Sequence, residues 1–339
     1  MKRLLNFLGV FGVALLAVIL ILLFQSFMAG GGNLFLVNRF TTFTTIFLGI
    51  FIEAAPFLML GTLASGVVEI FFNQDAIRRL LPRNAFMGAL AGGIMGFFFP
   101  VCECGVVPLT RRLFTKGLPP AVGVAFLLAS PVINPIVIAS TYAAFGFSPV
   151  FWLRIGLSLF IAVTVGLIFA VQMRPERLLR PVALAPIQGG SVDFVEPTPT
   201  QPLLSRLQQA LRIGADEFFE MGRYLILGSM LAALMQTFIP QTTLLALGQG
   251  PVLSIIAMMA LAVILSICST VDAFIALAFV GTFSTGSILS FLVFGPMVDI
   301  KSALMYLQVF NRKTVIYLIS LPMLMSFLMA LILNYYVGL

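Results

Sequence analysis

The sequence has no histidine, three cysteines, a single tryptophan and few charged residues over its 339 positions. Without histidine the chain cannot form a histidine-ligated haem, a histidine-based metal site or a serine–histidine–aspartate triad. Three cysteines are too few for a disulfide framework. A P-loop, a Walker motif and a dinucleotide-binding fingerprint are also missing, which excludes ATP-driven pumping by this chain alone. We therefore expect no cofactor, no resident metal and no enzymatic activity.

The scarcity of charge identifies the class of protein. Only 9% of the residues are charged, against roughly 25% in a typical soluble domain. Hydrophobic residues make up 60% of the chain, more than a compact soluble fold of this size can bury. The apolar runs are long and continuous rather than alternating, which argues against an outer-membrane barrel. The sequence predicts an all-α integral membrane protein in contact with lipid.

The charges that are present are mostly basic. Nineteen Lys and Arg residues against twelve Asp and Glu residues give a net charge of +7. In a soluble protein this excess would suggest nucleic acid as a partner. Membrane proteins keep Lys and Arg in their cytoplasmic loops, which explains the excess here without any nucleic acid.

Nine apolar segments follow one another along the chain. They cover residues 7–24, 41–72, 85–117, 118–145, 150–173, 210–238, 251–283, 284–310 and 314–337. The first segment follows Lys2 and Arg3 and is longer than the apolar core of most signal peptides. It is predicted to be an uncleaved span with the N-terminus in the cytoplasm.

The one long polar stretch, 174–209, is rich in Pro, Gly, Gln and Thr and is predicted to be a cytoplasmic linker. It divides the chain into an extra span with an outer loop (1–40), a first membrane repeat (41–173) and a second one (210–339). FIEAAPFLMLG at 51–61 and FFEMGRYLILG at 218–228 share five of eleven positions. Farther along, Cys102 aligns with Cys268, Pro131 with Pro296 and Asn134 with Asp299 at a nearly constant offset.

Two of the apolar segments are interrupted. In 85–117 the break at 100–105 leaves arms of roughly 15 residues, which rise about 22 Å in a bilayer core about 30 Å thick. The segment is either one broken span or a re-entrant hairpin. A hairpin keeps Arg111, Arg112 and Lys116 in the cytoplasm, so that fifteen of the nineteen basic residues lie there or at its edge.

We therefore expect seven full spans and two re-entrant hairpins, the second at 251–283. The two repeats then run in opposite directions across the membrane. Inverted repeats with broken helices are typical of secondary transporters, which bind substrate near the bilayer midplane. The predicted location is the inner (plasma) membrane.

Four helix breaks are predicted to meet near the midplane, at 100–105, 130–135, 268–272 and 295–299. Proline at a break removes a helical donor and frees backbone groups that can bind a substrate or ion. Burying ionisable side chains in a membrane is costly, so a functional role is the default interpretation for them. The candidate substrate-binding residues are Cys102, Glu103, Cys104, Ser130, Asn134, Cys268, Ser269, Thr270, Asp272 and Asp299.

Cys102-x-Cys104 is the sharpest local feature. Residues two apart point to opposite sides of a helix, so both sulfurs can reach one ligand only where the helix is unwound. Thiolates favour soft partners such as Cu(I), Zn(II) or trivalent metalloids. Alternatively, the cysteines are small apolar residues that ease tight packing. Cys268 stands alone in its break, and its loss is predicted to matter less.

Three further ionisable residues are candidates for gating or ion coupling. Glu53 and Glu220 occupy equivalent positions in the two repeats. Lys301 is predicted to pair with an acid on the neighbouring hairpin. Arg154 is expected near the outer face of the membrane.

The segments FFFPVCECGVVPLTRRLFTKGLPP (97–120) and FLLASPVINPIVI (126–138) resemble the bacterial permease family of the ArsP organoarsenical efflux permeases and the YraQ-type predicted permeases. The resemblance covers nearly all of the membrane part. It implies an inner-membrane permease, in some relatives one that exports trivalent organoarsenicals recognised through cysteines. The residues that match the motifs are Cys102, Cys104, Ser130, Pro131, Asn134 and Pro135.

Three functions are compatible with these features. The first is a secondary permease that exports a metalloid or another small soft solute. The second is a transporter of a soft metal cation such as Cu(I) or Zn(II), although the breaks lack His and Met clusters. The third is a membrane scaffold or intramembrane enzyme, which the internal symmetry disfavours. A homodimer is compatible with each of them.

Overall fold

The computed structural model describes residues 34–72, 84–99, 101–172, 178–180, 203–238 and 250–337. Within these ranges the chain is helical apart from turns and two isolated bridges, Leu179 with Phe310 and Val280 with Phe283. The predicted all-α class is confirmed. The predicted first span at 7–24 and most of the predicted linker lie outside the described residues.

Five stretches of the described chain are long and apolar enough to cross a membrane. They are α2 (Leu34–Phe71), α8 (Pro149–Gln172), α10 (Leu203–Phe238), α14 with α15 (Thr285–Met297 and Ile300–Val309), and α16 (Arg312–Ile332), which continues as a π-helical segment η2 at Leu333–Val337. They correspond to the predicted spans at 41–72, 150–173, 210–238, 284–310 and 314–337. Helix α10 begins at Leu203, within the 174–209 segment.

The remaining helices are short. They are α4 (Ala85–Phe98), α5 (Glu103–Thr115), α6 (Pro120–Ala129), α7 (Pro135–Phe145), α12 (Pro251–Leu265) and α13 (Asp272–Leu277). The segment 118–145, expected to form one broken span, is divided into α6 and α7. Pro135 opens α7, and the Asn134 side chain accepts a hydrogen bond from the Ile136 N–H as its N-cap. The helices end at all four predicted breaks.

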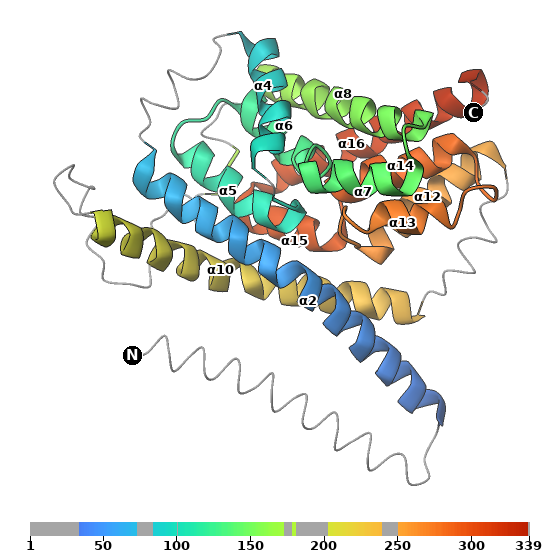
Figure 1. The fold of residues 1–339 in the computed structure, drawn as a ribbon, viewed down its shortest axis with the longest axis horizontal. Coiled ribbons are helices and arrows are strands. Elements are labelled where there is room, and N and C mark those ends of the chain that lie inside the picture. The colour runs from blue at the N-terminus through green and yellow to red at the C-terminus, as the bar shows by residue number, and fades with distance from the viewer. Residues whose placement is uncertain are drawn as a thin grey trace.

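Helices α2 and α10 lie side by side and run antiparallel (Figure 1). Near the start of α2, Arg39 donates to the Thr237 carbonyl at the end of α10. At the opposite end, Arg206 donates to the Ile70 carbonyl over 3.1 Å. Small residues allow this packing, because a Cβ added to Gly66 would lie 2.2 Å from the Ala210 carbonyl oxygen.

The other helices form two groups packed in the same way. In the first half of the chain, α4, α6 and α8 contact one another, and in the second half α12, α14 and α16 do the same. Between the groups, α5 contacts α15 and α7 contacts α13, so each half places its shorter helix segments against those of the other half (Figure 1). The centre of the molecule is therefore built from helix ends belonging to both halves.

Gly61 fixes the distance between α2 and α5. A Cβ at this position would lie 2.3 Å from the Gly105 Cα, whereas a Cβ at Gly49 on the same helix would meet nothing within 4 Å. The backbone of α5 thus reaches α2 directly just beyond the first helix break. Gly61 is needed for the position of the residues that follow Cys102.

We expect Gly61→Ala to lower the stability of the detergent-solubilised protein, because the new methyl group must push α5 away. Overpacking of this kind costs roughly 1–3 kcal/mol. Gly49→Ala is the matched control and should be neutral or stabilising, since Ala is the better helix former. The comparison is made by thermal unfolding followed by size-exclusion chromatography. Equal melting temperatures for the two variants would contradict the close contact.

Candidate functional site

Three of the four helix breaks bring ionisable groups and thiols together. Cys102 is the N-cap of α5 with extended backbone, and Glu103 is the first residue of that helix. Cys268 lies in the non-helical stretch between α12 and α13. Asp299 is the N-cap of α15, and Lys301 is in its first turn. We call Cys102, Glu103, Cys104, Cys268, Asp299 and Lys301 the thiol–carboxylate cluster.

The three thiols of this cluster are free and buried. Cys102, Cys104 and Cys268 are 5%, 0% and 4% exposed. The Cys102 side chain interacts with both Cys104 and Cys268, and all three belong to one core cluster. Because Cys102 is extended while Cys104 is helical, residues two apart can contact each other here, as the unwound-tip interpretation requires. Cys268 does not stand alone, although its position in the sequence suggests that it does.

Lys301 lies between two carboxylates. Its Nζ is 3.6 Å from Glu103 Oε1 and 3.5 Å from Asp299 Oδ2, and all three residues are only 2% exposed. A Cβ at Gly228 would lie 2.9 Å from the Lys301 Cα, so this glycine lets α10 pack directly on the start of α15. Lys301 thus pairs with an acid of the first hairpin segment, Glu103, and with its own N-cap.

The second break is anchored to the start of α15. Ser266 has a left-handed backbone (φ 46°) at the end of α12, and its hydroxyl accepts a hydrogen bond from the Ile300 N–H over 3.3 Å. In the same region Tyr306 donates to the Met297 carbonyl over 3.1 Å. These bonds fix the stretch that carries Cys268 beside Asp299 and Lys301.

Ser130 and Asn134 lie beside the first break rather than within the cluster. The Asn134 amide donates to the Val101 carbonyl over 3.4 Å. Ser130 is fully buried, and a Cβ at Gly96 of α4 would lie 2.6 Å from its Cα. Both residues therefore support the stretch that presents Cys102.

The residues after Cys268 make different contacts. Thr270 interacts with Cys268, whereas the Ser269 carbonyl accepts a hydrogen bond from Arg154 over 3.4 Å. Asp272 binds Arg154 with both carboxylate oxygens, at 2.7 and 2.9 Å, and Arg154 also donates to the Thr141 hydroxyl over 2.8 Å. The structure thus engages Asp272 with Arg154 instead of bringing it to the thiols.

The basic-residue count placed Arg154 near the outer face and gave it no partner. In the structure it is 0% exposed and pairs with a buried acid. The signal was present in the sequence, because Arg154 is the only charged residue in the apolar segment 150–173. A buried charge in such a segment needs a partner.

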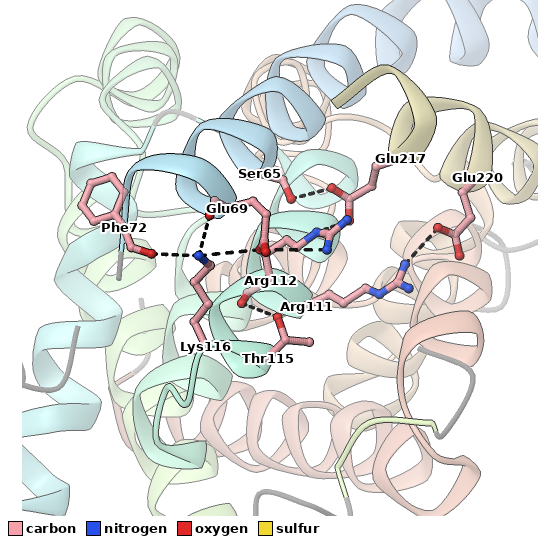
Figure 2. A network of polar contacts seen from close by, with 9 residues as sticks. All are labelled: Ser65, Glu69, Phe72, Arg111, Arg112, Thr115, Lys116, Glu217 and Glu220. Carbon is pink, nitrogen blue, oxygen red and sulfur yellow. Dashed lines mark hydrogen bonds and ion pairs between the residues drawn. The ribbon is translucent and has the colours of Figure 1, made fainter. Parts of the chain in front are cut away.

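A second group of charges joins α5 to α2 and α10 (Figure 2). Glu217 is fully buried, accepts a hydrogen bond from Ser65 over 2.5 Å and lies 3.5 Å from Arg112. Arg111 is 3.1 Å from Glu220. We call Ser65, Glu69, Arg111, Arg112, Lys116, Glu217 and Glu220 the α5 arginine network.

Lys116 closes this network at the end of α5, where it donates to the backbone carbonyls of Glu69 and Phe72 over 2.6 and 2.8 Å (Figure 2). The sequence interpretation used Arg111, Arg112 and Lys116 only as markers of topology and missed Glu217. Glu53, the counterpart of Glu220, is partly buried and interacts electrostatically with Lys301. The two glutamates therefore have different partners.

The described part of the chain contains no group of three or more Cys, Asp or Glu side chains arranged to hold a metal ion. Cys102 interacts with each of the other two thiols. The Lys301 ammonium group interacts with Cys104 and Cys268 as well as with Glu103 and Asp299. This arrangement can offer sulfur ligands to a soft solute and can exchange protons at its carboxylates.

We expect Asp272→Asn to destabilise the protein, because it leaves the Arg154 guanidinium buried without its counter-charge. Removing one partner of a buried ion pair costs about 3–5 kcal/mol. The double variant Arg154→Met/Asp272→Leu removes both charges and should recover most of that loss. Thermal stability in detergent measures both effects. A double variant as unstable as Asp272→Asn would show that the pair contributes more than charge compensation.

Comparison with known proteins agrees with the motifs. The ArsP_1 family model, described as "Predicted permease", matches residues 39–335. The UPF0718 protein YcgR of Bacillus subtilis (strain 168) is 46% identical over 285 residues, which cover 84% of this chain and 94% of that protein. A Streptococcus mutans protein named "Putative two-component membrane permease complex subunit" is 37% identical over 288 residues, covering 85% and 93%.

No solved structure matches the chain. The family match spans all five long apolar helices and every residue of the thiol–carboxylate cluster. The resemblance drawn from the two sequence motifs is confirmed, and it implies a transporter rather than an enzyme. The chain is a multi-pass membrane protein and belongs to the ArsP_1 family of predicted permeases.

Proposed function

We propose that the protein is a secondary permease of the inner (plasma) membrane that exports a small soft solute such as a trivalent organoarsenical. The observation that carries this proposal is the meeting of three buried thiols from two separate helix breaks. Thiolates bind soft elements in preference to hard cations. The thiols come from both halves of the chain, so a movement of one half against the other changes the ligands that face a bound solute.

The architecture proposed for transport is a pair of inverted repeats with two re-entrant hairpins, α4–α5 and α12–α13. Three observations support it. Helices α2 and α10, which start the two repeats, run antiparallel. The packing of α4, α6 and α8 recurs in α12, α14 and α16. Asn134 and Asp299, at equivalent positions, each cap the helix that follows a break.

In this arrangement the N-terminus is cytoplasmic, the repeats span 41–173 and 210–339, and the linker at 174–209 connects them in the cytoplasm. The charged contacts then lie on either side of the thiols. The α5 arginine network, with Arg111 and Glu220, is on the cytoplasmic side, and the Arg154–Asp272 pair is on the other. Each ties the second arm of one hairpin to a long helix of the other half. Breaking them in alternation would expose the thiols to one side at a time.

A partner subunit is part of the proposal. The Streptococcus mutans relative is named as a subunit of a two-component complex. We infer that this chain also assembles with a second polypeptide, in addition to or in place of the homodimer considered from the sequence. Affinity purification of the tagged chain from its own cells, followed by mass spectrometry, would identify that polypeptide.

Replacing the thiols is expected to abolish transport. In everted membrane vesicles, Cys102→Ser and Cys104→Ser should reduce the energised accumulation of phenylarsine oxide to the level of vesicles without the protein. Cys268→Ser should have a comparable effect, because Cys268 contacts Cys102. Ser158→Ala, which changes a buried hydroxyl on α8 outside the cluster, is the control.

The same vesicles test the alternative cargo. Arsenite, Cu(I) and Zn(II) are offered in parallel, and accumulation of a metal cation without the arsenical would favour a soft-metal transporter. Full transport by the Cys102→Ser/Cys104→Ser double variant would show that the sulfurs only pack.

The hairpin proposal makes a separate prediction. In a cysteine-free background, Thr115→Cys at the end of α5 should react with a membrane-impermeant maleimide only from the cytoplasmic side. A hairpin returns to the side from which it entered, whereas a crossing segment would place residue 115 in the periplasm. Labelling from the periplasmic side would refute the hairpin.

A further inference from the structure

The charges in the thiol–carboxylate cluster do not balance. Glu103 and Asp299 contribute two carboxylates, Lys301 contributes one ammonium group, and all three are 2% exposed. An uncompensated charge in the interior of a membrane protein is expensive. One further positive charge is needed, and a proton on a carboxylate is the smallest that supplies it.

The contacts of Asp299 fix it as the ionised carboxylate. Its Oδ1 accepts the Ser302 backbone N–H over 2.6 Å, and its own N–H donates to the Ser302 hydroxyl over 3.0 Å. This capping box places the carboxylate at the positive end of the α15 dipole, which favours the charged form. Lys301 lies two residues farther along α15. It therefore stays beside Asp299 when the two halves of the chain move against each other.

Fewer contacts stabilise a negative charge on Glu103 than on Asp299. Both acids lie at nearly the same distance from Lys301 Nζ, 3.6 Å for Glu103 Oε1 and 3.5 Å for Asp299 Oδ2, and the second oxygen of Glu103, like Asp299 Oδ2, is buried without a hydrogen-bond partner. The difference is the bond from the Ser302 N–H, which only Asp299 accepts. Apart from Lys301, the carboxyl has the N–H of its own residue at the start of α5. A protonated carboxyl needs fewer partners than a carboxylate, so Glu103 is the group that fits the neutral form.

Among the residues that the structure describes, the surroundings of Glu103 supply no second cation. From the α12–α13 break it faces the Cys268 thiol, and from α15 it faces Asp299, Lys301 and the Tyr306 hydroxyl. On its own element Cys102 and Cys104 flank it, and Glu53 of α2, which interacts with Lys301, adds further negative charge.

The two arginines farther along α5 are committed elsewhere, Arg111 to Glu220 and Arg112 to Glu217. Within the described part of the chain, Lys301 is thus the cation that pairs with Glu103, and it is shared.

We infer that Glu103 reversibly binds one proton, and that this proton is the coupling ion the permease exchanges for its substrate. The inference rests on the proposed permease function and names its coupling ion. Glu103 belongs to the first half of the chain and Lys301 to the second, so their separation changes when the halves move. When Glu103 is protonated, Lys301 forms an ion pair with Asp299 alone. When the proton leaves, the ammonium group also balances the negative charge of Glu103. Glu103 lies between Cys102 and Cys104 in the sequence, so the proton site and two of the thiols belong to the same helix break.

Infrared spectroscopy tests the proton site without any knowledge of the substrate. The purified full-length protein in lipid nanodiscs should show a carboxylic-acid carbonyl band that shifts in D2O and disappears as the pH is raised. Glu103→Gln should lack this band. In Asp299→Asn the Lys301 ammonium group faces Glu103 as its one remaining carboxylate, so the band should disappear at a lower pH than in the natural protein. Glu103→Gln resembles the protonated acid in shape and charge, so it should melt at or above the temperature of the natural protein. Asp299→Asn removes the counter-charge of Lys301 and the helix cap, and should melt lower.

Three outcomes would overturn the inference: no titrating band in the natural protein, a band that persists in Glu103→Gln, or a band that titrates in Asp299→Asn at the same pH as in the natural protein. Coupling is then measured with phenylarsine oxide in proteoliposomes, where an imposed pH gradient should drive accumulation by the natural protein but not by Glu103→Gln. A titrating band at Glu103 without accumulation of the probe under any gradient would refute the arsenical cargo and leave the proton site standing. Gradient-driven accumulation that survives in Glu103→Gln would refute the coupling role.

Discussion

Lys301 is the charge on which the centre of this protein depends. A lysine that is 2% exposed has to be neutralised inside the protein, and the two acids that face it, Glu103 and Asp299, come from different halves of the chain. That requirement holds the start of α5 against the start of α15. The glycines at 61 and 228 let α2 and α10 pack on these same two helices without a side chain between them. The helix breaks, the antiparallel helices α2 and α10 and the buried charges therefore depend on one another for their positions.

Breaking helices at this depth exposes backbone groups that must find partners within the protein. Neighbouring breaks supply two of them: the Val101 carbonyl accepts a hydrogen bond from the Asn134 amide, and the Ile300 N–H donates to the Ser266 hydroxyl. A third bond is local, from the Ser302 N–H to Asp299 within α15. The breaks therefore stabilise one another. A solute that replaces some of these contacts can favour one arrangement of the halves over another, because its binding energy then differs between the two.

Much of this organisation could be predicted from the sequence, for a physical reason. Spans are visible as apolar length and three of the four breaks as proline, and both are local properties. The break at 268–272 has no proline or glycine and was found through the alignment of Cys268 with Cys102. The cost of burying charge marked Glu103, Asp299 and Lys301 as functional before any geometry was known. The repeat alignment placed Asn134 and Asp299 at equivalent breaks, and both are helix caps.

The choice of partners was not local and could not be predicted in the same way. Arg154 pairs with Asp272 across 118 residues, and Ser65 reaches Glu217 across 152. Such pairs depend on how each helix is rotated about its axis. A membrane helix is apolar on all sides, so its sequence does not show which face turns toward the protein. The count of basic residues used Arg154 only to assign topology and did not predict its ion pair with Asp272. The general lesson is that a lone basic residue within an apolar span indicates a buried acid on another helix. In this chain that acid, Asp272, lies four residues from Cys268, so the charge pair also restrains the thiol-bearing break.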